Sequence, residues 1–360
     1  MRMLLSVTAI LVAVLFAGRA QAGPTLLFEA ETGKILYSES IDDQWHPASL
    51  TKIMTAYIAF EDLRDGRIKL DTKITCTERA YKEPPSKVGL PVGAKMRMDT
   101  ALKALIIKSA NDVAVMIAEA LGPTHDRFIE RMNKTAKRLG MTRTHFANPN
   151  GLPDKRQVTT ARDLAKLARA ITKEFPEHAH YWSMPAFRLG KRRLSSHNGL
   201  LKSFEGADGL KTGFICDSGF NVVASATREG RKIMAVVLGE PSSADRNVRA
   251  ASLLEHGFRQ FGWKQLFNTD TVDNVPFQSD ARRAQSVRHT VTSWACGHRK
   301  SARRLRAAKN RVKRKHSPRK INKPAKPKEA IKKPVTKKKP KKPQQAAAAA
   351  PSTLHKVFEN

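Results

Sequence analysis

The chain has 360 residues with 66 Lys or Arg against 32 Asp or Glu, a formal net charge of +34, and residues 281–360 hold 26 of these basic residues against 2 acids. This length allows a sizeable core in one large domain or two ordinary ones, and the uneven charge marks a separate tail. Three cysteines, in no CxxC or Cys/His pattern, leave at least one unpaired and indicate neither a disulfide scaffold nor a zinc site, and we expect no metal and no other cofactor.

Residues 1–22 are expected to be a secretory signal. A basic start precedes an apolar run over residues 4–17, and Ala-Gln-Ala ends at Ala22. The apolar run is short for a membrane span of about 20 residues, so cleavage before Gly23 is preferred to an uncleaved anchor. The mature chain is therefore expected to be soluble and exported, in the periplasm or cell envelope.

The N-terminal part of the mature chain predicts a hairpin followed by a helix. Two short apolar runs within residues 25–38 flank Glu-Thr-Gly-Lys, which is typical of a β-hairpin at the edge of a sheet. After Pro47, residues 49–63 carry apolar side chains at helical spacing. Ser49 therefore lies at the start of a predicted helix.

The middle of the chain is predicted to be helical. Apolar periodicity indicates helices over residues 98–109, 112–121, 126–139 and 160–172. The break between the first two falls at Ser109-Ala110-Asn111, so polar side chains are expected at a helix junction.

The pattern changes to strands after residue 199. Strands are predicted over residues 209–212, 220–226 and 232–238, and an amphipathic helix over residues 245–261 has four apolar residues facing inward: Leu253, Leu254, Phe258 and Phe261. Strands at both ends with helices between them predict an α/β (α+β) domain, with one sheet beside a helical lobe.

Three short motifs could carry chemistry. Ser49 and Lys52 form a Ser-x-x-Lys sequence, which on a helix places both side chains on one face, and a lysine with a lowered pKa can take the serine proton. Alone this spacing means little, since Ser317 and Lys320 in the tail repeat it. Ser-Ala-Asn at residues 109–111 and Lys-Thr-Gly at residues 211–213 follow in order, and the ordered set is far more specific.

This ordered triple resembles the signature of serine β-lactamases and penicillin-binding proteins. More narrowly, the chain is similar to the low-molecular-mass D-alanyl-D-alanine carboxypeptidases from about residue 23 to 263. The resemblance implies the β-lactamase/DD-peptidase-like fold, with an antiparallel sheet flanked by helices. The segments that carry the similarity are residues 47–55, 109–112, 139–142, 144–152, 198–201 and 208–213.

The resemblance also implies roles for individual residues. Ser49 would attack the carbonyl between two D-alanines and form an acyl-enzyme, with Lys52 as its base. On the opposite wall, Ser109 would help pass the proton to the leaving amine, and Asn111 would hydrogen-bond the substrate backbone. Lys211 would help to hold the terminal carboxylate and would favour neutral Lys52.

The resemblance also implies substrate-binding roles for the other residues of the strand motif. Thr212 would share the terminal carboxylate with Lys211, Gly213 would leave room for a substrate strand, and the backbone N–H groups of Ser49 and Phe214 would form the oxyanion hole.

Four further residues lie near the motifs or on the last predicted helix and are candidates for the site. Arg246 is the preferred second cation for the carboxylate, with Arg249 as the alternative. The competing interpretation of either residue is a solvated charge on the helix surface. His197 is expected to have no metal or base role, because Lys52 already supplies the base. Cys216 is expected to be an inert small residue.

The implied function is a serine-type D-Ala-D-Ala carboxypeptidase acting on peptidoglycan stem peptides, with β-lactams as covalent inhibitors. A D,D-endopeptidase that cuts crosslinks is the alternative. A β-lactamase is disfavoured, since no Glu-x-x-Leu-Asn element is found.

The resulting organisation is a signal, a catalytic domain over residues 23–263, a linker over 264–280 and a disordered tail rich in Lys, Pro and Ala over 281–360. The tail could itself be the function, as an anchor on anionic envelope surfaces. Nucleic acid is not expected as a partner, because the tail lacks interleaved aromatic residues and the chain is exported.

Overall fold

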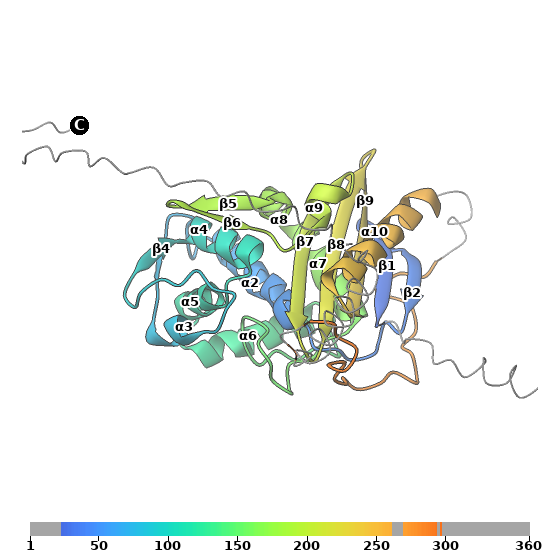
Figure 1. The fold of residues 1–360 in the computed structure, drawn as a ribbon, viewed down its shortest axis with the longest axis horizontal. Coiled ribbons are helices and arrows are strands. Elements are labelled where there is room, and N and C mark those ends of the chain that lie inside the picture. The colour runs from blue at the N-terminus through green and yellow to red at the C-terminus, as the bar shows by residue number, and fades with distance from the viewer. Residues whose placement is uncertain (1–22, 261–268, 294–295, 297–360) are drawn as a thin grey trace, which may run out of the picture. The chain divides into compact units, whose positions relative to one another are not determined.

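In the computed structural model of the protein, residues 23–260, 269–293 and Cys296 are described. Their main element is a five-stranded antiparallel sheet in the order β2-β1-β9-β8-β7 (Figure 1). The N-terminal hairpin therefore pairs with the last strand among the described residues, as strands at both ends predicted. The strands are β1 (Thr25–Glu29), β2 (Ile35–Glu39), β7 (Ala207–Ile215), β8 (Gly219–Arg228) and β9 (Arg231–Glu240).

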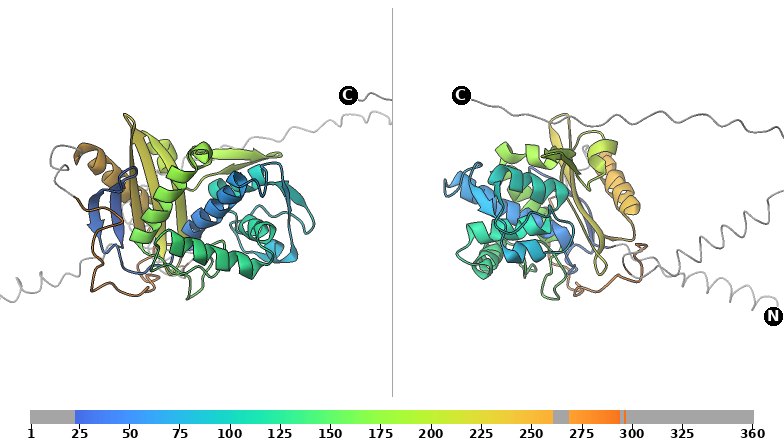
Figure 2. Two further views of the ribbon diagram at one scale, coloured as in Figure 1. Left: turned by 180° about the vertical axis from the view of Figure 1, so that it is seen from behind. Right: turned by 60° about the vertical axis from the view of Figure 1, so that its left-hand side comes forward.

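Both faces of the sheet are buried, because its central strands are apolar at nearly every position. On β9, Ile233, Ala235 and Val237 face one core, and Met234, Val236 and Leu238 face the other. Helix α10 (Ser243–Gln260) covers the first face and α7 (Ala161–Glu174) the second, on opposite sides of the sheet (Figure 2). In α10, Leu254 is fully buried, Leu253 and Phe258 are partly buried, and Phe261 lies outside the described residues.

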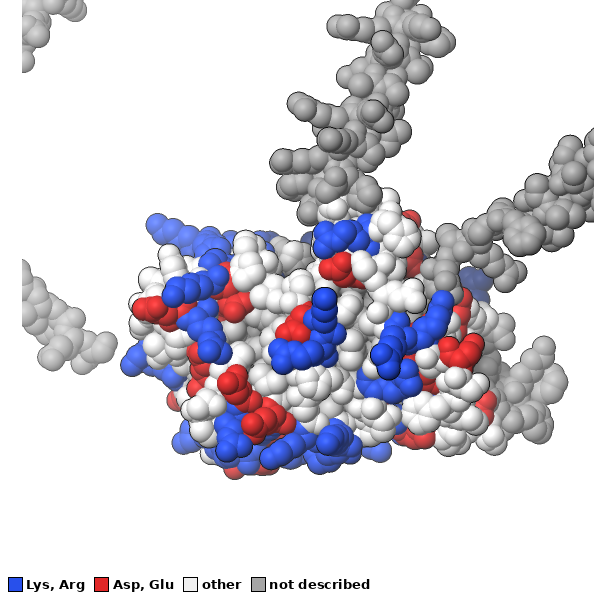
Figure 3. Space-filling view, turned by 90° about the horizontal axis from the view of Figure 1, so that it is seen from below, with Lys and Arg blue, Asp and Glu red and all other residues white. Residues whose placement is uncertain are grey.

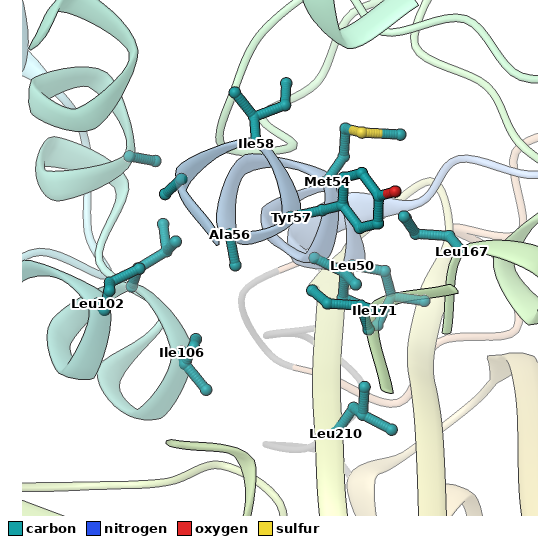
Figure 4. Packing of buried hydrophobic residues seen from close by; sticks show 14 of the residues in the cluster. Leu50, Met54, Ala56, Tyr57, Ile58, Leu102, Ile106, Leu167, Ile171 and Leu210 are labelled. Carbon is teal, nitrogen blue, oxygen red and sulfur yellow. The ribbon is translucent and has the colours of Figure 1, made fainter. Parts of the chain in front are cut away.

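The central helix begins beside the sheet and runs into the helical lobe. A 3-10 turn, η1 (Ala48–Thr51), leads into α2 (Lys52–Arg64), so Ser49 lies in the turn that opens the predicted helix. Every residue of α2 from Lys52 to Phe60 is buried, the polar Lys52 and Thr55 included, so this part of the helix is enclosed on all sides. Figure 4 shows Leu50 beside Ile171 of α7, and Ala56 on the side of the helix that faces Leu102 of the lobe.

The helical lobe contains the predicted junction at Ser109. Helix α4 (Met98–Lys103) continues as a π-helix, η2 (Ala104–Lys108), and α5 (Asn111–Leu121) begins after the break. The remaining elements of the lobe and its rim are α3 (Glu78–Lys82), α6 (His125–Arg138), η3 (Pro176–His178), α8 (His180–Ser183), α9 (Leu200–Ser203) and two small two-stranded sheets, β3 (Lys73–Thr75) with β4 (Lys95–Arg97) and β5 (Ala186–Leu189) with β6 (Arg192–Ser195). None of the described helices is both long and apolar enough to cross a membrane.

The segment after the last helix contacts the body, unlike a plain linker and tail. Within the expected linker, Val272 is fully buried and its N–H donates to the Gly33 carbonyl. Within the expected tail, the Arg282 guanidinium pairs with Asp43, and Val291 is buried. The tail boundary expected at residue 281 is therefore too early for residues 281–293, because ion pairs and apolar contacts hold them. Residues 297–360 lie outside the described part.

The charge excess is not concentrated on the surface of the body. On the face in Figure 3, Lys and Arg are interspersed with Asp and Glu, with uncharged side chains between them. This agrees with the sequence, in which residues 281–360 hold 26 Lys or Arg against 2 acids.

Candidate active site

A cavity of about 670 Å³ lies where the start of the central helix, the helical lobe, β7 and α10 meet. Each of these elements supplies at least one of the site residues predicted from the sequence. The predicted residues that line the cavity are Ser49, Ser109, Asn111, Thr212, Gly213, Phe214 and Arg246; Lys52 and Lys211 lie behind its walls and are almost fully buried.

Ser49 and Lys52 form the centre of the site. Their Oγ and Nζ atoms lie 3.0 Å apart, because three residues make one turn of the helix start. Lys52 Nζ also contacts Asn111 Oδ1 at 2.8 Å and the backbone oxygen of Asn150 at 2.5 Å. A neutral amine can donate its two N–H bonds to these oxygens and accept the Ser49 hydroxyl proton with its lone pair.

Burial favours the neutral form of Lys52. The side chain is fully buried, and desolvation together with the charge of Lys211 holds its pKa well below the ordinary lysine value. Glu83 and Asp112 act in the opposite direction. The pKa of Glu83 is itself raised by burial.

The wall from the helical lobe is shaped by backbone irregularities. Ser109 caps the π-helix in the left-handed conformation, with φ 61° and ψ 40°, which is uncommon for residues other than glycine, asparagine and aspartate. The Asn111 N–H then donates to the Ser86 carbonyl at 2.7 Å, and Asp112 accepts from the N–H groups of Val88 and Gly89. These bonds hold the loop around Ser86 against the start of α5.

The Asn111 side chain makes two hydrogen bonds within the protein. Besides contacting Lys52, it donates from Nδ2 to the Pro84 carbonyl at 2.9 Å. Its described contacts therefore position Lys52, a role that the resemblance did not imply.

Strand β7 lies unusually close to the turn that carries Ser49. A Cβ atom on Gly213 would lie 2.9 Å from the Pro47 carbonyl oxygen and 3.0 Å from the Ser49 nitrogen. Glycine is thus required by the protein's own backbone, and not only by a substrate strand. This contact brings the next residue, Phe214, to the cavity beside Ser49, and its ring stacks on Phe220 at 4.2 Å.

The two cations expected near the substrate carboxylate differ in position. Arg246 lines the cavity, and burial lowers its pKa to about 10. Lys211 does not line it; Lys211 Nζ donates to the Thr212 carbonyl at 3.0 Å, and burial together with Arg246 lowers its pKa to about 7. Arg249, the alternative to Arg246, pairs with Glu39 and Glu240 away from the cavity.

His197 and Cys216 also line the cavity. Burial, with Lys211 and then Lys108 and Arg246, lowers the pKa of His197 to about 4, so the ring is neutral near pH 7. The expectation that Cys216 is an inert small residue is wrong, because it forms a disulfide with Cys296. Cys76 is buried and unpaired.

Other residues of the site were given no role from the sequence. Asn150, whose carbonyl accepts from Lys52, lies in a segment used for the resemblance, so that segment was the available signal. A Cβ atom on Gly151 would lie 1.8 Å from the Ala48 carbonyl oxygen, so glycine is needed there too. Arg288 lines the cavity from the expected tail, where no motif pointed to it. Among the described residues, no group of three or more His, Cys, Asp or Glu could hold a metal.

Comparison with known sequences identifies the family. The model of the peptidase S11 family, D-alanyl-D-alanine carboxypeptidase, matches residues 13–242. The D-alanyl-D-alanine carboxypeptidase DacF of Bacillus subtilis is 33% identical over 262 residues, covering 71% of this chain and 67% of the relative. DacC of Escherichia coli is 35% identical over 243 residues, covering 66% of this chain and 61% of the relative. The chain thus spans about three fifths to two thirds of the length of these relatives.

Solved structures agree in fold. Penicillin-binding protein 5 of Haemophilus influenzae is 32% identical with a TM-score of 0.65, and the match covers 67% of this chain and 72% of that one. Penicillin-binding protein D2 of Listeria monocytogenes, in a cefotaxime-bound form, is 30% identical with a TM-score of 0.60, covering 66% and 97%. The fold and the Ser-Lys site define a serine acyl-transfer protein of the penicillin-binding class. The chain belongs to the D-alanyl-D-alanine carboxypeptidase family, so the predicted family and fold class are confirmed.

Proposed function

We propose that the protein is a serine-type D-Ala-D-Ala carboxypeptidase that removes the terminal D-alanine from peptidoglycan stem peptides. The observation that carries this proposal is the 3.0 Å contact between Ser49 Oγ and a fully buried lysine amine, at a cavity that Arg246 also lines. An activated nucleophile beside a cationic end suits a peptide with a free carboxylate.

In the proposed mechanism, Lys52 takes the Ser49 proton as Oγ attacks the carbonyl carbon of the penultimate D-alanine. The backbone N–H groups of Ser49 and Phe214 stabilise the oxyanion, which Gly213 permits by its close approach to Ser49. Collapse expels D-alanine, whose amine receives the proton through Lys52 and Ser109. Water then hydrolyses the acyl-enzyme.

The terminal carboxylate would bind to Thr212 and Arg246 at the cavity surface. Lys211 does not line the cavity, and its positive charge would attract the carboxylate from beneath the cavity wall. Neutral His197 adds no charge there.

The test is to supply the full chain with a pentapeptide ending in D-Ala-D-Ala and to measure released D-alanine. Mass spectrometry after labelling with a β-lactam should place the adduct on the peptide that contains Ser49. Cleavage of crosslinked muropeptide dimers without D-alanine release would instead support the endopeptidase alternative. Rapid release of the β-lactam adduct would support a β-lactamase.

Export to the periplasm or cell envelope is part of this proposal. The Cys216–Cys296 disulfide supports it, since such bonds form mainly in oxidising compartments. The basic residues after residue 296 would attract anionic envelope surfaces. A fractionation experiment that finds the chain only in the cytosol would contradict this.

A further inference from the structure

The segment formed by residues 281–293 and Cys296, here called the C-terminal strap, crosses the end of β7. At that end the turn Cys216-Asp217-Ser218 joins β7 to β8. The strap is attached to this turn covalently, through the Cys216–Cys296 disulfide, whose partners are 80 residues apart in sequence.

Polar contacts fasten the same turn. Ser286 Oγ donates to Asp217 Oδ1 at 2.6 Å, and the Val287 N–H donates to the Asp217 carbonyl at 3.0 Å. The Arg288 guanidinium pairs with Asp217 Oδ2 at 3.2 Å. Ser286, followed by Arg288, lowers the pKa of Asp217, so this carboxylate is ionised at neutral pH.

The strap forms part of the candidate active site. Cys216, Asp217 and Arg288 line the same cavity as Ser49. An adjoining cavity of about 340 Å³ shares Ile215 and Asp217 with it, and Lys155 and Ser286 also line this second space. Just over half of the Arg288 side chain, 54%, is exposed at this rim.

The direction of a bound peptide follows from the proposed function. Its terminal carboxylate lies toward Thr212 and Arg246, and its scissile carbonyl lies between the amides of Ser49 and Phe214. Since β7 is an edge strand, the rest of the peptide can pair along it past Phe214. The residue that precedes D-Ala-D-Ala therefore reaches the turn at Asp217 and the strap.

We propose that the strap forms a subsite for the side chain of this preceding residue, and that Arg288 binds a carboxylate on that side chain. The subsite rests on the proposed function for its orientation. Arg288 lines the first cavity and Lys155 the second; the two carboxylates at these cavities are each paired, Asp154 with Arg156 and Asp217 with Arg288, and the latter pair fixes the Arg288 guanidinium in place. The matching substrate class is a stem peptide with a diamino acid whose side chain ends in a carboxylate.

The experiment compares two pentapeptides that end in D-Ala-D-Ala and differ only in the third residue, diaminopimelate or lysine. Lysine lacks only the distal carboxylate. Binding is measured by calorimetry on the full chain carrying Ser49→Ala, so that turnover does not interfere. We expect the diaminopimelate peptide to bind about tenfold more tightly, since a charge-assisted hydrogen bond at a half-exposed site is worth roughly 1.4 kcal/mol.

Arg288→Gln in the same background should remove this preference. Arg283→Gln is the matched control, because it removes the same charge from the strap but lines a different cavity, and it should retain the preference. The double variant Cys216→Ser/Cys296→Ser should reduce the preference by loosening the strap. Equal affinity for both peptides, or a preference that survives Arg288→Gln, would overturn the subsite.

Release of D-alanine by the chain with Ser49 intact is measured in parallel. No release from either peptide, with the binding preference preserved, would reject the proposed hydrolysis and leave the subsite standing. The two proposals therefore fail separately.

Discussion

The Lys52 amine is surrounded by polar oxygen atoms and is fully shielded from solvent. Its contacts with Ser49, Asn111 and Asn150 fix its direction, and its burial beside the charge of Lys211 lowers its pKa. A lysine with a pKa near its ordinary value would be charged at neutral pH and could not accept the serine proton. The environment of this one residue therefore decides whether the pair is reactive.

Replacement of Lys52 by arginine should slow acylation sharply, because it puts a permanent cation in the place of a neutral amine. Arginine does not lose its proton in proteins, so the general base is removed. We expect the rate of β-lactam acylation to fall by about 10²–10⁴-fold, the usual contribution of general-base catalysis. Lys166→Arg, the same change at a lysine that contacts the Gly140 carbonyl, is the control. If Lys52→Arg acylated at the wild-type rate, Lys52 would not be the base.

The pH dependence of kcat/KM should show a falling limb near pH 7. The pKa of Lys211 is lowered to about 7, so Lys211 is charged below this pH and loses its charge above it. Above pH 7 the attraction for the substrate carboxylate weakens, and kcat/KM reports this group in the free enzyme. Lys211→Arg should move the limb out of the measurable range. A profile unchanged by that substitution would contradict the assignment.

Individual residues were predictable from the sequence mainly where a motif contained them. Seven of the nine predicted site residues line the cavity: six lie in or directly after the three motifs, and the seventh, Arg246, was placed on the last predicted helix. The burial of Lys211 behind Thr212 and the pairing of Cys216 depend on distant parts of the chain. No local pattern records such contacts.

At the scale of elements, periodicity predicted the long helices and the main strands because each buries an apolar face. The two-stranded sheets β3–β4 and β5–β6 were missed, since strands of three or four residues have too few positions for an alternating pattern. The close approach of β7 to η1 could not be predicted from the sequence either. It depends on the packing of two elements about 160 residues apart.

Gly213→Ala tests this close approach. The added Cβ would lie 2.9 Å from the Pro47 carbonyl oxygen, so β7 and the Ser49 turn must separate and the two proposed oxyanion donors with them. Loss of an oxyanion donor costs about 10²–10³-fold in kcat, and we expect a loss of this order in D-alanine release. Gly66→Ala, at a site with open space, should cost only backbone strain of roughly 1–2 kcal/mol and leave the rate unchanged. Equal rates for both variants would refute the argument.

At the scale of the whole molecule, the C-terminal segment completes the body. Arg162 and Asp42 form a fully buried pair, and Arg162 also donates to the carbonyls of Val275 and Pro276. The strap then reaches Asp43 and Asp217. Composition alone assigned the strap to the tail, because its charge resembles that of the residues beyond it. The strap differs in its contacts with the body, which are the acidic partners Asp43 and Asp217, the disulfide and the burial of Val291.

Two truncations should therefore behave differently. A chain that ends after Cys296 keeps the strap, and we expect wild-type D-alanine release with weaker binding to anionic vesicles. A chain that ends at residue 280 loses the contacts to Asp43 and Asp217 and should melt at a lower temperature. Identical melting of the two chains would mean that the strap does not stabilise the body.

Loss of the Cys216–Cys296 disulfide should lower the free energy of unfolding. The bond joins residues 80 apart, and a crosslink across a loop of this size stabilises a protein by about 2–4 kcal/mol, chiefly by restricting the unfolded chain. Urea unfolding of the Cys216→Ser/Cys296→Ser chain should show this loss as a lower midpoint. A reducing agent should produce the same shift in the wild type and no further shift in the double variant, since Cys76 is unpaired. An unchanged midpoint would show that the strap is held by its ion pairs and buried side chains alone.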